Sequence, residues 1–151
     1  MLKKAILATV LTISASAALA MPDFAGEYNC KISTTSPEGS QSLEAPVSFA
    51  VSDAGLTMSG AGSQTSDPMP CKNSTEDINQ NGVTAKAVMS CSASVLGFDI
   101  KVSIPAQNID VKTAMSFEKT SATQLKFVID ANGVNQGQSI SAKIVGDCTK
   151  K

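Results

Sequence analysis

Apolar and polar residues alternate with a period of two along most of the chain, and no long stretch has the period of a helix. Turn residues such as Ser36-Pro37-Glu38-Gly39 and Asp53-Ala54-Gly55 separate the alternating stretches. The stretches with apolar alternate positions are Tyr28–Ile32, Leu43–Val51, Leu56–Met58, Val83–Ala93, Phe98–Ile104, Ile109–Phe117, Leu125–Ile129 and Ile140–Cys148. This pattern predicts about eight β-strands joined mostly by short loops.

The faces opposite these apolar positions are rich in Ser, Thr and Lys, which indicates antiparallel strands with one wet face. We therefore predict an all-β fold, an antiparallel meander of about eight strands. A closed or nearly closed barrel hides the edges of such a sheet most simply. A two-sheet β-sandwich is the alternative architecture.

Two segments interrupt the alternation. Ser59–Gly82 is rich in Gly, Ser, Pro and Asn, and a loop of this length is typically functional or flexible. Within it, Ser74 followed by Glu76 and Asp77 predicts one capped helical turn. Near the end of the chain, Asn132-Gly133 predicts the start of a turn region that extends to Gly137.

The first 20 residues have the three parts of a secretory signal peptide. Lys3 and Lys4 are followed by a short apolar stretch, Ala5–Ile13, and then by the small-x-small site Ala18-Leu19-Ala20. We predict cleavage after Ala20, a single domain over residues 21–151, and a secreted or periplasmic location of bacterial type. The apolar stretch is too short to span a bilayer, so we expect no transmembrane segment after cleavage.

All four cysteines, Cys30, Cys71, Cys91 and Cys148, lie after the predicted cleavage site. An even number in an exported chain predicts two disulfides, which can pair in three ways. If the barrel closes, the first and last strands become neighbours and Cys30 can meet Cys148. Cys71 then pairs with Cys91 and fastens the long loop to a core strand.

Composition argues against most enzyme chemistry. The chain has no His, no Arg and no Trp, so it cannot form a Ser-His-Asp triad, an imidazole metal site or an Arg fork. We therefore expect a non-enzymatic protein with no cofactor and no metal. Of the 12 lysines, two lie in the signal segment, and 13 acidic residues oppose the rest. This mildly acidic balance argues against a nucleic-acid partner.

The interior supplies the first functional hypothesis, a barrel that holds a small apolar ligand. Small residues such as Ala85, Ala87 and Ala142 share the inward face with large ones and leave room. The candidate ligand-binding residues are Tyr28, Phe49, Met58, Met69, Met89, Phe98, Phe117 and Phe127. The alternative is a protein-interaction or inhibitor domain that offers the 59–82 loop, with Met69 between two prolines, to an extracytoplasmic protein.

Short motifs carry three resemblances. Gly26-Glu27-Tyr28, Cys71 to Asp77, Met89-Ser90-Cys91 and the final Lys143 to Cys148 resemble an uncharacterised family of secreted bacterial β-rich proteins, which implies no particular activity. The Gly-x-Tyr opening also resembles the calycin barrels, the lipocalins and fatty-acid-binding proteins, which implies a ligand-binding barrel. Tyr28-x-Cys30 together with Cys148 resembles the small periplasmic lysozyme inhibitors.

Overall fold

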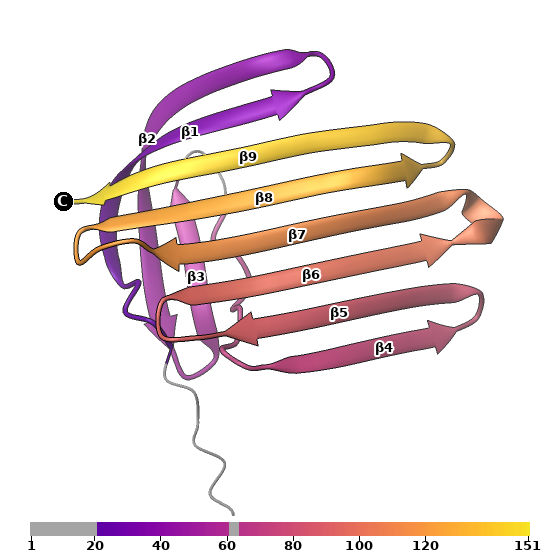
Figure 1. Ribbon diagram of the computed structural model, residues 1–151, viewed down its shortest axis with the longest axis horizontal. Coiled ribbons are helices and arrows are strands. Elements are labelled where there is room, and N and C mark those ends of the chain that lie inside the picture. Colours follow the sequence, from indigo (N-terminus) through magenta and orange to yellow (C-terminus); the bar gives the residue numbers. More distant parts are fainter. Residues whose placement is uncertain (1–20, 61–63) are drawn as a thin grey trace, which may run out of the picture.

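Nine antiparallel strands and one short 3-10 turn make up the described part of the chain, residues 21–60 and 64–151 of a computed structural model (Figure 1). None of the described residues lies in an α-helix, and no described helix could cross a membrane. The elements are β1 (Gly26–Ser36), β2 (Gly39–Ser52), β3 (Gly55–Gly60), β4 (Ser74–Gln80), β5 (Val83–Cys91), β6 (Val95–Ile104), η1 (Pro105–Gln107), β7 (Ile109–Lys119), β8 (Gln124–Asn135) and β9 (Gln138–Lys150).

The strands form one sheet in the order β3-β2-β1-β9-β8-β7-β6-β5-β4. Each strand pairs with the next one in sequence, except that β3 does not pair with β4. In addition, β1 pairs with β9. The sheet is therefore an open antiparallel meander in which the first and last strands of the chain are neighbours and β3 and β4 form the two ends. The predicted all-β meander is confirmed, with nine strands in place of about eight. The sheet is not closed, which is consistent with a nearly closed barrel and with the sandwich alternative.

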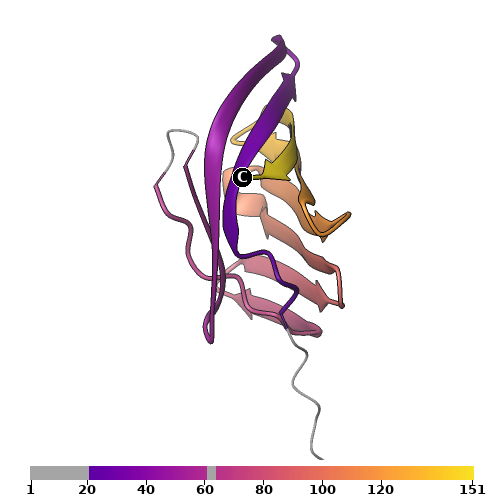
Figure 2. The ribbon, with the colours of Figure 1, turned by 90° about the vertical axis from the view of Figure 1, so that its left-hand side faces the viewer.

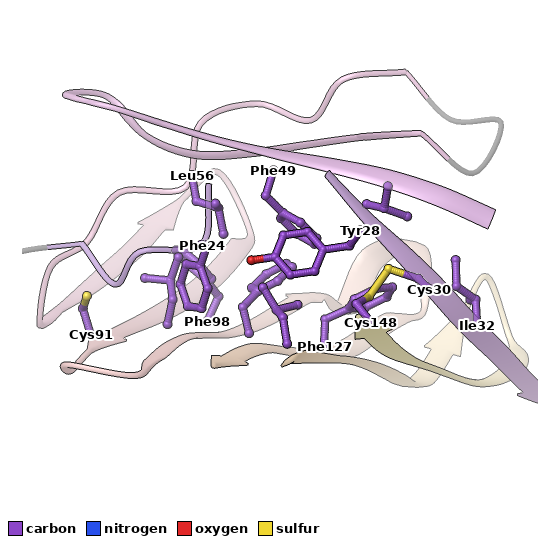
Figure 3. Packing of buried hydrophobic residues seen from close by; sticks show 14 residues of the cluster. Phe24, Tyr28, Cys30, Ile32, Phe49, Leu56, Cys91, Phe98, Phe127 and Cys148 are labelled. Carbon is purple, nitrogen blue, oxygen red and sulfur yellow. A yellow bond between two sulfur atoms is a disulfide. The ribbon is translucent and has the colours of Figure 1, made fainter. Parts of the chain in front are cut away.

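The curvature brings two walls of the sheet together over one core. Figure 2 shows the layer of β1, β2 and β3 facing the layer of β4 to β9. Tyr28, Phe49, Phe117 and Phe127 form a continuous chain of ring contacts across that space, with centroids 5.6 to 6.2 Å apart (Figure 3). These contacts join the first wall to the second. The Tyr28–Phe49 and Phe49–Phe117 pairs are edge-to-face, and such pairs contribute roughly 0.5–1.5 kcal/mol each beyond area burial.

Both predicted disulfides are present, with the predicted pairing. Cys30 and Cys148 lie directly opposite each other in the β1–β9 ladder, and their Cα atoms are 4.0 Å apart. Cys71 is bonded to Cys91 at the end of β5. The first bond closes a loop of sequence separation 118, for which the chain-entropy model gives roughly 4–5 kcal/mol.

The predicted helical turn at Ser74, Glu76 and Asp77 is wrong, because residues Ser74–Gln80 form β4. Asn81 and Gly82 both have positive φ, so they form the two-residue turn of a tight hairpin with β5. Pairing with β5 outweighs the local capping signal. The irregular segment is therefore shorter than the predicted 59–82 loop, and residues 61–63 of that loop lie outside the described residues.

The turn predicted from Asn132-Gly133 is also displaced. β8 continues through both residues to Asn135, and the chain reverses at Gln136-Gly137. Gly133 is needed for another reason, because a Cβ atom there would collide with the backbone oxygen of Asp110 on β7.

A second glycine, Gly146, makes room for the aromatic core. It lies opposite both Ile32 of β1 and Phe127 of β8, and the Phe127 ring lies across its backbone. A Cβ atom at Gly146 would overlap that ring. Because Gly146 has no side chain, the Phe127 ring of β8 can lie directly over the backbone of β9, next to β1.

We predict that Gly146→Ala lowers the free energy of unfolding by about 1–3 kcal/mol, because the Phe127 ring must move out of its packed position. Urea denaturation measures the change. Gly97→Ala is the matched control, since a Cβ atom there comes close to the flexible Ser90 hydroxyl, at 2.6 Å, and lies at ordinary contact distance, 3.8 Å, from the Met115 backbone oxygen. Phe127→Leu should recover part of the loss in a double mutant, and equal effects of the two glycine substitutions would contradict the argument.

Candidate functional site

An apolar groove lies on the concave face of the sheet, beside the aromatic core. It has a volume of about 180 Å³ and lies between the wall of β1, β2 and β3 and the strands β8 and β9. Its lining is mostly apolar; the residues are Ile32, Thr34, Leu43, Val47, Met58, Gly60, Phe127, Ile129 and Ile144. The groove is smaller than the roughly 300–1,000 Å³ of pockets that enclose a whole drug-sized ligand.

The mouth of the groove carries a large exposed hydrophobic residue. Leu43 on β2 is 51% exposed, although it points to the same face as the buried Val47 and Phe49. β2 is an edge strand here, because β3 pairs only with residues Val47–Ser52. The first half of β2 therefore has no strand on its outer side in the described chain, and Leu43 lines the groove together with Ile129 and Ile144.

The apolar face continues beyond the groove. Ile129 and Ile144 face each other in register, and the next pair on the same face is Ala131 and Ala142. The inward positions of β4, β5, β6 and β7 at this end are also apolar; they are Ile78, Ala85, Ala87, Ile100, Val102 and Val111. We call these eight residues, from Ile78 to Ala142, the distal face. None of them belongs to the buried core.

The core lies at one end of the long strands only. The buried residues of β5 to β9 are Cys91, Leu96, Phe98, Phe117, Leu125, Phe127 and Cys148. All of these lie near the turns β5–β6 and β7–β8 or the end of β9. In Figure 1, β2 and β3 pass behind that left-hand part of the sheet. The distal face lies at the opposite ends of the same strands.

The structure places the eight predicted ligand-binding residues in two environments. Met58 and Phe127 line the groove. Tyr28, Phe49, Phe98 and Phe117 are buried in the core, and Met69 and Met89 pack against it. Sequence reasoning missed Ile32, Leu43, Ile129 and Ile144, although all four have inward parity. The alternation of apolar residues continues beyond the part of each strand that the core covers, and inward residues there are partly exposed. This continuation is the signal in the sequence that was overlooked.

Met69 belongs to a segment that covers the edge of β3. The backbone N–H of Leu56 donates to Met69 O at 2.9 Å, and the N–H of Met69 donates to Leu56 O at 2.8 Å. The Met69 side chain packs against the core. It therefore does not provide the exposed anchor that the alternative hypothesis, a loop offered to a partner, requires.

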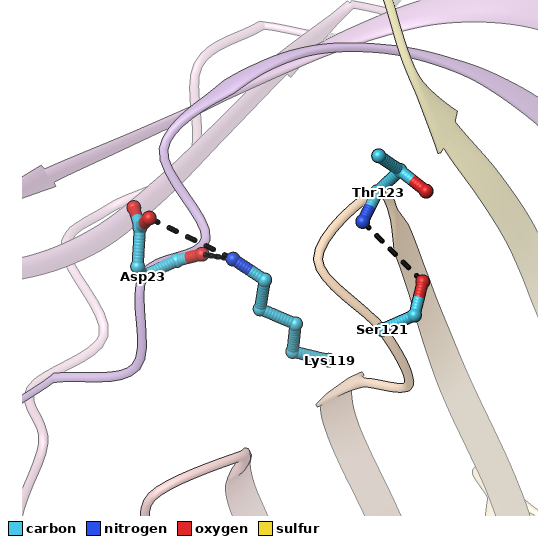
Figure 4. Close-up of polar contacts among 4 residues, drawn as sticks. All are labelled: Asp23, Lys119, Ser121 and Thr123. Carbon is cyan, nitrogen blue, oxygen red and sulfur yellow. Dashed lines mark hydrogen bonds and ion pairs between the residues drawn. The ribbon is translucent and has the colours of Figure 1, made fainter.

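The segment before β1 is also fastened to the core end. Phe24 is fully buried, and Lys119 Nζ donates to the backbone oxygen of Asp23 at 2.6 Å and lies 3.6 Å from its carboxylate (Figure 4). Tyr28 is the third residue of β1. Its hydroxyl is directed toward the region of Phe24 (Figure 3). The chain therefore seals this end of the barrel with its own first described residues.

The Tyr28 hydroxyl is a buried polar group with no hydrogen-bond partner among the described residues. The residue is 1% exposed. Burial, and to a smaller extent the nearby Asp23 carboxylate, raise the pKa of the Tyr28 hydroxyl above 10.0. Both causes disfavour the charged phenolate, so this hydroxyl is not set up as a base.

No described residues form a cluster of three or more His, Cys, Asp or Glu side chains that could hold a metal ion. Asn132 Nδ2 donates to Asp130 Oδ1 at 3.5 Å, but the two residues lie two positions apart on the same face of β8, within the strand ladder.

Comparison with protein-family models and with curated proteins gives no match, so the three family resemblances remain hypotheses. One solved structure, "Structure of EF1p2_mFAP2b bound to DFHBI", is similar to this chain with a TM-score of 0.37 and 17% sequence identity. The similarity covers 84% of this chain and 93% of that chain. At this score it carries no argument about the function.

We predict that Tyr28→Phe raises the free energy of unfolding by about 1 kcal/mol. The substitution removes a hydroxyl that loses its hydrogen bonds to water on folding and forms none with the described residues. Tyr28→Leu is the control, since it also removes the ring contact with Phe49 and should destabilise. Urea denaturation of both variants measures the difference. A clear loss of stability in Tyr28→Phe would show that the hydroxyl has a partner, such as a bound water.

We also predict that stability falls as the pH rises above 10. In the unfolded chain Tyr28 loses its proton near 10.0, whereas in the folded chain it keeps the proton to higher pH. The stability from this group is therefore complete below pH 10 and is lost as the pH rises through the folded pKa. Tyr28 is the sole tyrosine, so the absorbance of tyrosinate reports its titration directly. A folded pKa at or below 10 would contradict the prediction, and Tyr28→Phe should lack this component.

Proposed function

We propose that this protein is a non-enzymatic binding protein that holds a small apolar ligand on the concave face of its sheet. The observation that carries the proposal is the groove of about 180 Å³ whose lining is mostly apolar. A typical ligand pocket is concave and mostly apolar with few polar groups, and in this groove Thr34 is the polar side chain.

The shape of the groove favours a chain-like ligand over a compact one. Its volume accommodates only part of a typical ligand, while the apolar surface continues past Ile129 and Ile144 over Ala131 and Ala142. The small side chains of this second pair keep the path shallow. An aliphatic chain can bury one end in the groove and lie along this path, gaining about 0.8 kcal/mol for each methylene that leaves water.

The two disulfides support a location outside the cytoplasm, since such bonds persist in oxidising compartments. Export by cleavage after Ala20 remains part of the proposal, because residues 1–20 lie outside the described residues. A binding protein in that compartment meets apolar ligands in water, where an apolar groove provides the driving force for uptake.

We predict that Leu43→Ser weakens binding of an environment-sensitive fluorescent fatty acid about five-fold. The ligand covers the exposed half of Leu43, and losing that burial costs roughly 1 kcal/mol. The free energy of unfolding should change by no more than about 0.5 kcal/mol, because the side chain is exposed in the unliganded protein. Fluorescence titration and urea denaturation measure the two effects.

Val51→Ser is the matched control, since Val51 lies on the same strand, is 39% exposed and does not line the groove. It should bind the fatty acid as the unaltered protein does. Equal binding by all three proteins, or no binding by any of them, would overturn the proposal. Mass spectrometry of an organic extract of protein purified from its host identifies the natural ligand.

A further inference from the structure

The two terminal strands of the sheet, β3 and β4, are protected differently. The edge of β3 is covered by residues Ser66–Met69, through the paired backbone hydrogen bonds between Leu56 and Met69 and through the Ser66 hydroxyl, which accepts from the N–H of Met58 at 2.9 Å. At the other edge, β4 pairs with β5 alone in the described part of the chain. Its residues from Thr75 to Gln80 are exposed, and Figure 1 shows it as the last strand of the sheet.

The hairpin register fixes which backbone groups of β4 point outward. Gln80 and Val83 flank the two-residue turn, so they form the hydrogen-bonded pair that closes the hairpin. Hydrogen-bonded and non-hydrogen-bonded pairs alternate along an antiparallel ladder. The N–H and C=O groups that point away from β5 therefore belong to Thr75, Asp77 and Asn79.

This alternation limits how a second copy of the chain can pair with β4. The outward groups of both copies must face each other, so the two-fold axis passes through one residue of each strand. An axis at Glu76 or Asp77 places two identical carboxylates directly opposite each other, which is destabilising. An axis at Thr75 or Asn79 leaves the exposed Ile78 opposite a polar residue. An axis at Ile78 places Ile78 opposite Ile78, and both carboxylates then face amide side chains.

We propose that two copies of this protein associate through β4, in the antiparallel register that is centred on Ile78. In this register Asp77 lies opposite Asn79 of the second copy, and Glu76 lies opposite Gln80. Each carboxylate thus faces a side chain that donates hydrogen bonds. Ile78, which is 54% exposed and the most exposed large hydrophobic residue of the chain's described part, is covered by its own symmetry mate.

Association in this register joins the two sheets into one. Ile78 belongs to the distal face, so the apolar concave faces of the two copies meet along the new strand pair. A single pair of short strands buries less than the roughly 800 Å² per partner of a standard interface. The dimer is therefore expected to be weak and to depend on protein concentration. The inference does not rest on the proposed function, and Leu43→Ser should dimerise as the unaltered protein does.

Sedimentation velocity over a concentration series tests the association. The unaltered protein should shift from monomer to dimer as the concentration rises. Ile78→Lys should weaken dimerisation about ten-fold or more, because it places two like charges opposite each other at the axis. Val51→Lys, a comparable change at an exposed hydrophobic residue of β2, should leave it unaltered. A protein that stays monomeric throughout overturns the proposal and leaves β4 open to a strand of another protein.

Disulfide cross-linking tests the register. Ile78 forms a non-hydrogen-bonded pair with its symmetry mate, in which Cα atoms are about 4.5 Å apart and a disulfide can form. Ile78→Cys should therefore yield a covalent dimer on mild oxidation. Thr75→Cys is the control, since its symmetry mate lies about 20 Å away along the strands. The native cysteines do not interfere, because none in the described chain is free. Stronger cross-linking by Asp77→Cys or Thr75→Cys than by Ile78→Cys would overturn the register.

Discussion

The pairing of β1 with β9 is the interaction on which the rest of the structure depends. It turns a linear meander into a curved sheet, and it places Cys30 opposite Cys148 so that a disulfide can lock the two ends of the chain together. Because β2 and β3 follow β1, the same pairing carries them over the concave side. Tyr28 and Phe49 then meet Phe117, and the aromatic core forms at the end of the strands where these residues lie.

The position of the core explains the candidate site. The covering wall lies over one end of strands β5 to β9, so their inward residues are buried at that end and partly exposed at the other. The groove lies at this boundary, with Phe127 on its core side and Ile129 and Ile144 on its open side. An apolar surface that continues out of a core marks an interaction site more often than a defect of packing.

The sequence predicted the features that depend on the alternation of inward and outward residues along a strand. It failed where the pairing of β4 with β5 overrides a local helix-start signal. The alternation of Tyr28, Cys30 and Ile32 gives the inward face, and the adjacency of first and last strands gives the disulfide pairing. Ser74, Glu76 and Asp77 resemble a helix start, but β5 provides a ladder that a single helical turn cannot match. The groove could not be predicted, because parity says which side chains point inward and not how far the covering wall extends.

The concave face and the free edge of β4 reflect one physical compromise. A sheet that closes completely has no edge to protect, but its interior then fills with side chains or encloses a cavity. Here the sheet stays open between β3 and β4, which keeps the distal face accessible and leaves β4 without a neighbouring strand in the described chain. Covering residues protect β3, whereas β4 carries Glu76 and Asp77, and inward or edge charges oppose indiscriminate strand pairing. The same two carboxylates disfavour the registers centred on Glu76 and Asp77, and they face amide side chains in the register that places Ile78 opposite its own copy. The edge is therefore selective and not simply blocked.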